Sequence, residues 1–110
     1  MKLSYLAEKL GLKALTGGDL AEREVSRCYI GDLLSWVMGA ANSGDAWITI
    51  MSNINIVAVA TLCDTALIIL AEGVTIDDAV KNTANDKGIN ILSSKESAFT
   101  LASKIAELLP

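Results

Sequence analysis

The pattern of apolar and polar positions is most informative in the middle of the chain, where residues 46–63 carry no formal charge and residues 65–71 are again apolar. A membrane span needs about 20 predominantly apolar residues. Polar side chains interrupt this stretch, however, and Ser52 and Asn53 form a helix-start signal within it. The pattern therefore predicts a strand–helix–strand unit of a buried parallel sheet, with its parts at residues 47–51, 54–62 and 66–71.

Further helices and strands are predicted on both sides of this unit. Each helix shows an apolar stripe at helical spacing behind a polar residue that can cap its first turn. The predicted caps are Ser4, Asp32, Thr75 and Ser93, and the predicted helix ends include Gly11 and Gly88. Residues 16–19 have the composition of a turn. Additional short strands are predicted at residues 12–15, 24–30 and 89–92.

This order of elements predicts one α/β domain over residues 1–110. We expect a three-layer sandwich, in which a mainly parallel sheet of about four to five strands is flanked by helices. The helix at 54–62 has no evident polar face. Such a helix packs on more than one side, so the sheet must cover one side and either another helix or a second subunit the other.

Composition adds an expectation about assembly. Hydrophobic residues make up 52% of the 110 residues, and soluble monomers rarely expose large apolar patches. We therefore predict a homodimer, with a simply well-filled core as the alternative. Trp36 and Trp47 are expected to pack within the protein, although either could anchor a subunit contact.

Charge narrows the range of partners. The formal net charge is −4, and all 9 Lys and Arg residues lie before residue 28 or after residue 80. Nucleic acids and anionic membrane surfaces normally require a basic patch, so neither is predicted as a partner. The start of the chain lacks the apolar core of a secretory signal, and we predict a cytoplasmic protein with reduced thiols.

The chemistry-bearing residues favour a protein that is not an enzyme. There is no histidine, and Cys28 and Cys63 form no C-x-x-C pair. The usual zinc sites and catalytic triads therefore cannot be built, and neither glycine-rich phosphate-loop motif is present. We predict no catalytic residue, no metal site and no cofactor.

A small-ligand site is nevertheless predicted at one edge of the sheet. Ligands of open α/β sheets bind at the carboxyl ends of the strands, where this chain places a polar rim that extends to Ser93 and Ser94. Each of these residues also has a simpler role as a cap or turn residue. The residues predicted to bind a ligand are Asp32, Ser35, Ser52, Asn53, Asn55, Glu72 and Gly73.

Blocks of sequence in the same order and spacing resemble the DRTGG domain family. They are Glu-Arg-Glu-Val at 22–25, Tyr-Ile-Gly-Asp-Leu-Leu-Ser at 29–35, Gly-Asp-Ala-Trp-Ile-Thr-Ile at 44–50, Asn-Ile-Val-Ala-Val-Ala at 55–60 and Leu-Ile-Ile-Leu-Ala-Glu-Gly at 67–73. The resemblance implies a small α/β domain similar to the amino-terminal domain of HPr kinase, without the kinase domain. It also implies a regulatory or ligand-sensing role and dimer formation.

The chain departs from the family where the family's name originates. In our alignment the Thr-Gly-Gly motif falls just before Tyr29, where this chain has Ser26, Arg27 and Cys28. Bulky side chains there would obstruct a ligand that approaches the backbone closely. Three hypotheses follow: a non-enzymatic regulatory homodimer, a sensor of an adenine nucleotide or phosphometabolite, and an enzyme related to HPr kinase.

Overall fold

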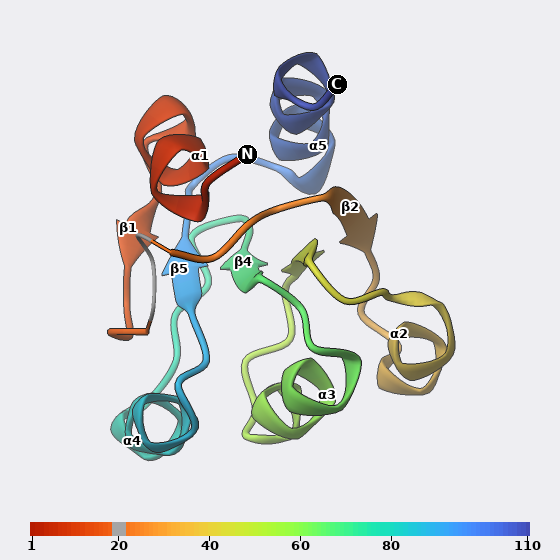
Figure 1. Ribbon diagram of the computed structural model, residues 1–110. Helices are drawn as coiled ribbons and strands as arrows, with labels where there is room; N and C mark the ends of the chain where they lie inside the picture. Colours follow the sequence, from red (N-terminus) through yellow and green to blue (C-terminus); the bar gives the residue numbers. More distant parts are fainter. Residues whose placement is uncertain (19–21) are drawn as a thin grey trace.

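The sheet of the computed structural model, which describes residues 1–18 and 22–110, has the strand order β1-β5-β4-β3-β2 (Figure 1). Strands β2 to β5 run parallel, and β1 pairs antiparallel with β5 at the opposite edge from β2. Asp19 of the predicted turn lies outside the described residues. The strands are β1 Lys13–Ala14, β2 Arg27–Ile30, β3 Asp45–Thr49, β4 Leu67–Leu70 and β5 Ile91–Ser93.

Helices cover both faces of this sheet, which confirms the predicted three-layer α/β fold (Figure 1). One face packs against α1 (Leu3–Leu10) and α5 (Ala98–Leu108). The other packs against α2 (Leu34–Ala40), α3 (Asn55–Cys63) and α4 (Asp78–Lys87). Successive strand residues point to opposite faces, so every residue of β3 and β4 is buried.

The predicted caps of the last two helices, Thr75 and Ser93, are wrong. Asp77 caps α4 by accepting a hydrogen bond from the backbone N–H of Val80 (3.0 Å). Ser97 caps α5 by accepting one from the N–H three residues later (3.2 Å). In each case the residue that adopts the extended conformation next to the first helical turn makes the bond.

The first two predicted caps are also wrong, whereas the predicted ends are correct. Ser4 lies within α1, and α2 begins after Leu33, with no side chain capping it. Asp32 uses its carboxylate elsewhere, as described below. Gly11 and Gly88 adopt left-handed conformations, with φ of 64° and 69°, which a glycine adopts without strain.

Helix α3 lies on the sheet between α2 and α4. Neighbouring helices therefore contact its flanks, and no second subunit is needed to explain its apolar sequence. Its exposed residues carry no charge, and 71% of Leu62 is accessible to solvent. Among the described residues, no helix combines the length and the hydropathy that crossing a bilayer would require.

The buried polar groups explain where β3 begins and how it is held. Asp45 is the first residue of β3 and is buried. Its carboxylate accepts hydrogen bonds from the backbone N–H of Asn42 (2.7 Å) and from the Arg27 guanidinium (3.4 Å). The indole N–H of buried Trp47 donates to the Gly31 carbonyl (2.9 Å). The buried polar groups of Asp45 and Trp47 are thus paired.

Candidate functional site

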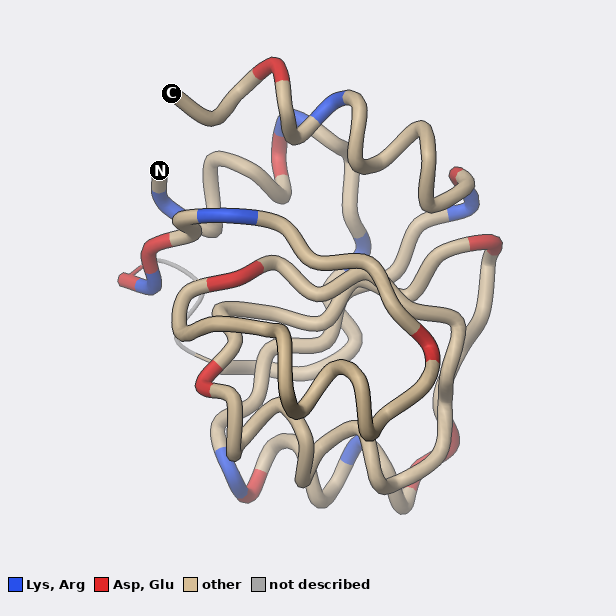
Figure 2. Tube along the Cα trace, turned by 90° about the vertical axis from the view of Figure 1, so that its right-hand side faces the viewer, with Lys and Arg blue, Asp and Glu red and all other residues tan. Residues whose placement is uncertain are grey.

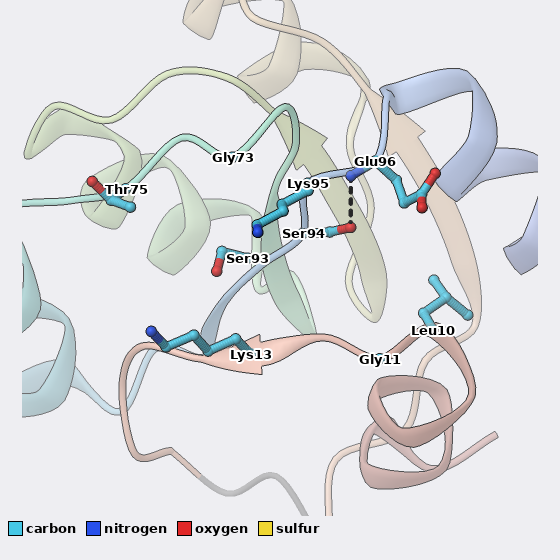
Figure 3. A pocket seen from close by; sticks show the side chains of 9 residues that line it. All are labelled: Leu10, Gly11, Lys13, Gly73, Thr75, Ser93, Ser94, Lys95 and Glu96. Atoms are coloured by element: carbon cyan, nitrogen blue, oxygen red, sulfur yellow. Dashed lines mark hydrogen bonds between the residues drawn. The ribbon is translucent and has the colours of Figure 1, made fainter.

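A hollow of about 430 Å³ opens at the carboxyl ends of β4 and β5, next to β1 (Figure 3). Its size is within the range of roughly 300–1,000 Å³ typical of small-molecule sites. Its position matches the rule that open α/β sheets bind ligands at the carboxyl ends of their strands. The residues that line it are Leu10, Gly11, Lys13, Gly73, Thr75, Ser93, Ser94, Lys95 and Glu96.

The pairing of β1 with β5 brings two lysines to this hollow. Lys13 lies directly opposite Ser93 in the antiparallel pair, and directly opposed residues place their side chains on the same face. Lys95 follows two residues after Ser93. Figure 3 shows both lysine side chains extending into the hollow, with the Ser93 hydroxyl between their ammonium groups in this view.

The turn after β4 forms another wall and is fixed by backbone hydrogen bonds. Glu72 and Gly73 have φ of 60° and 74°, and a positive φ is uncommon for a residue with a side chain. Their N–H groups donate to the carbonyls of Glu96 and Ser94, each at 2.9 Å. The segments after β4 and after β5 are therefore tied together, and the hollow between them is preformed.

The two lysines give this end of the hollow a local positive charge. Neither Lys13 nor Lys95 forms an ion pair with another described residue. The Glu96 carboxylate lies at the other end of the hollow and points away from both ammonium groups (Figure 3). This local pair of cations is set in a chain whose net charge is −4.

The structure gives Asp32 a structural role. Its Oδ1 accepts hydrogen bonds from the Thr49 hydroxyl (2.8 Å) and from the backbone N–H of Ile50 (3.0 Å). These bonds fix the end of β3 against the loop that leads into α2. Asp32 does not line the 430 Å³ hollow.

The other residues predicted to bind a ligand are spread over separate places. Gly73 lines the hollow, whereas Ser52 and Asn53 lie in an exposed turn before α3 and Asn55 is the exposed first residue of that helix. The Asn53 side chain accepts a hydrogen bond from the backbone N–H of Asn55 (2.9 Å), which is the simpler role as a cap or turn residue that the sequence analysis also gives it. Ser35 lines a separate shallow hollow on α2, together with Trp36, Gly39 and Ala40.

Sequence reasoning missed the two lysines and Thr75 as lining residues. Lys13 belongs to a strand of only 2 residues, and its partner lies far away in sequence. A local pattern therefore cannot show that Lys13 and Lys95 share a hollow. The available signal is that Lys13 lies within a predicted strand and that Lys95 lies beyond the carboxyl end of another.

The two thiols are poorly suited to nucleophilic chemistry. Burial, with a smaller contribution from the charge of Asp45, raises the pKa of Cys28 to about 11. Burial also raises the pKa of Cys63. Because the thiolate is the nucleophile, both side chains are protonated near neutral pH. Within residues 1–18 and 22–110, no group of three acidic or thiol side chains is placed to hold a metal ion.

An ion pair closes the opposite end of the sheet, where Arg23 contacts Asp64. The Arg23 guanidinium donates to the Asp64 carboxylate (3.0 Å), and the Ser43 hydroxyl donates to the same carboxylate. Both contacts lower the pKa of Asp64, and the hydrogen bond from the Ser43 hydroxyl has the larger effect. Asp64 itself has a left-handed conformation after α3, with φ of 56°.

Comparison with known proteins agrees with this fold, a small α/β domain with a mainly parallel sheet. The DRTGG domain family model matches residues 5–108. The chain therefore belongs to the DRTGG domain family, which confirms the resemblance noted in the sequence. No curated protein sequence matches significantly.

One solved structure with the same fold is the CBS and DRTGG domains of the regulatory region of Clostridium perfringens pyrophosphatase, in complex with its activator diadenosine tetraphosphate. The TM-score is 0.75 and the sequence identity is 16%. The match covers 99% of this chain but only 47% of the other. At this identity the similarity establishes the fold.

Proposed function

We propose that the protein is a non-enzymatic regulatory module that acts as a homodimer and binds a small ligand in the hollow beside β1, β4 and β5. The observation that carries this proposal is the preformed hollow at the carboxyl edge of the sheet. Membership of the DRTGG family supports it, as does the fold shared with a regulatory region that binds a nucleotide activator. Location in the cytoplasm stays a prediction.

The surface at the other edge of the sheet supports a homodimer. Strand β2 is an edge strand, and unpaired backbone groups on such an edge readily pair with another chain. Next to it, Leu33, Trp36 and Met38 have exposed fractions of 61%, 69% and 52%. Figure 2 faces this side, and residues 33–44 include no charged side chain. Soluble monomers rarely expose such a patch.

The shape of this surface favours a second copy of the chain as its partner. Trp36 projects beside the shallow hollow formed with Gly39 and Ala40. Around a two-fold axis, the Trp36 side chain of each copy can fill the hollow on the other, because an isologous interface uses the same patch twice. Tryptophan is also among the residues that most often dominate interface energies.

Sedimentation equilibrium at micromolar concentration tests the homodimer. We expect a dimer, and we expect Trp36→Lys to shift it to monomer because the substitution places a charge in an apolar interface. Tyr5→Lys is the matched control, since Tyr5 is an exposed aromatic residue on α1 at 46%. A monomeric wild-type protein, or a Trp36→Lys variant as dimeric as the control, would contradict the proposal.

A sensor of an adenine nucleotide or phosphometabolite is the second candidate, and the lysines of the hollow favour it. A thermal-shift screen with nucleotides and phosphorylated metabolites should raise the melting temperature with at least one compound. An enzyme related to HPr kinase is the third. Magnesium-dependent turnover of ATP would support an enzyme, whereas the absence of histidine and of a phosphate-loop motif predicts none.

A further inference from the structure

We infer that the hollow binds a small phosphate monoester, with its phosphate group held between the ammonium groups of Lys13 and Lys95. This inference rests on the ligand-binding part of the proposed function and specifies its chemistry. In the view of Figure 3 the Ser93 hydroxyl lies between the two ammonium groups, and it can donate a third hydrogen bond. Thr75 adds a second hydroxyl to the lining.

The fold positions these groups independently of any ligand. The register of β1 and β5 sets Lys13 opposite Ser93. Hydrogen bonds from the Glu72 and Gly73 N–H groups hold the segment around Lys95 in place. A ligand therefore has only the two lysine side chains to order, which limits the entropic cost of binding.

Charge favours phosphate over a carboxylate. Two cations without an ion-pair partner among the described residues share one hollow. A phosphate monoester carries about −1.5 to −2 charges at pH 7 and offers three acceptor oxygens, whereas a carboxylate carries one charge. A doubly charged anion neutralises both ammonium groups, whereas a single carboxylate leaves one positive charge uncompensated.

The rest of the hollow favours a hydroxylated ester group. A volume of about 430 Å³ leaves room beyond the phosphate itself. The Glu96 carboxylate, at the end away from the lysines (Figure 3), accepts hydrogen bonds from hydroxyl groups and repels a second phosphate. A sugar phosphate or nucleoside monophosphate therefore fits better than a compound with phosphates at both ends.

Isothermal titration with ribose 5-phosphate tests this inference, with ribose as the probe that lacks phosphate. We expect binding of ribose 5-phosphate, no measurable binding of ribose, and weaker binding at higher salt. Lys13→Gln and Lys95→Gln should each weaken binding about tenfold or more, because each removes a charge-assisted contact. Lys95→Arg should retain most of the wild-type affinity, since it keeps the positive charge that Lys95→Gln removes.

Lys104→Gln is the matched control, because Lys104 is an exposed lysine on α5 that does not line the hollow. An equal loss of affinity in this control would overturn the inference by showing a general charge effect. Equal binding of ribose, or no binding of ribose 5-phosphate at millimolar concentration, would also overturn it. The broader proposed function would still stand if sedimentation of the same samples shows a dimer and if the thermal-shift screen finds a ligand whose binding Lys13→Gln does not weaken.

Discussion

Replacement of Asp32 separates a structural role from a ligand-binding role at a position for which the sequence analysis names both. Both hydrogen bonds to this side chain, from the Thr49 hydroxyl and from the Ile50 N–H, end on a single atom, Oδ1. Asp32→Ala removes both and leaves the buried Thr49 without this acceptor. Because a bond to a charged group contributes about 1.5–3 kcal/mol and one of these bonds is solvent-exposed, we estimate a loss of about 2 kcal/mol.

This loss converts into a measurable change in melting temperature. With an unfolding entropy of about 2.1 cal/mol/K per residue, a chain of 110 residues should melt about 9 °C lower. Asp32→Asn should cost less, since an amide oxygen can still accept both bonds at the position of Oδ1. Circular dichroism during heating measures each variant.

Asp86→Ala is the control for this experiment, because Asp86 is an exposed acid on α4. Its free energy of unfolding should stay within about 0.5 kcal/mol of the wild-type value. Binding of ribose 5-phosphate should be unchanged in Asp32→Ala at temperatures where it is folded. An unchanged melting temperature, or a folded variant that no longer binds the ligand, would refute this reasoning.

Two predictions concern pH. Burial raises the pKa of Cys28 from 9.0 to about 11, so the unfolded chain loses this proton first and the free energy of unfolding should fall as the pH rises from 9 to 11. Urea titrations should show a smaller fall for Cys28→Ser. An identical pH dependence in both proteins would contradict this assignment. The pKa of Asp64 is lowered from 3.8 in the folded state, mainly by the Ser43 hydroxyl. Its contribution to the free energy of unfolding is therefore present above pH 3.8 and disappears as the pH falls through the lower pKa of the folded state. Asp64→Asn should therefore lose less stability than the wild type on acidification below pH 3.8, and parallel acid unfolding curves would argue against this role.

The sequence predicted those features that depend on a residue and its immediate neighbours. Gly11 and Gly88 mark helix ends because the left-handed conformation is an intrinsic preference of glycine. The caps were harder to assign, because Thr75 and Asp77 are both good capping residues two positions apart. Which of them takes the extended conformation depends on how α4 packs, and no local pattern contains that information.

The candidate site was only partly predictable, for a related reason. The carboxyl edge of the sheet follows from parallel strand order, and Gly73 and Ser93 at that edge line the hollow. The contribution of Lys13 depends on an antiparallel pairing between segments about 80 residues apart, as the register of Lys13 with Ser93 shows. The sequence predicts that both tryptophans pack within the protein, yet Trp36 is 69% exposed and Trp47 is fully buried.

The two proposed surfaces lie at opposite edges of one sheet. The hollow adjoins β1, β4 and β5, and the apolar surface adjoins β2. Between them, every residue of β3 and β4 is buried, and close-packed interiors resist gradual deformation. Because coupling between sites requires an element with two discrete arrangements, neither buried strand is suited to carry a signal. The turn at Glu72 and Gly73 lies at the hollow itself, and its hydrogen bonds link it to the segment after β5. Regulation by a bound phosphate ester would therefore act through this edge of the domain, where a further domain or partner could contact it, and dimer formation would be a separate, constant property of the β2 edge.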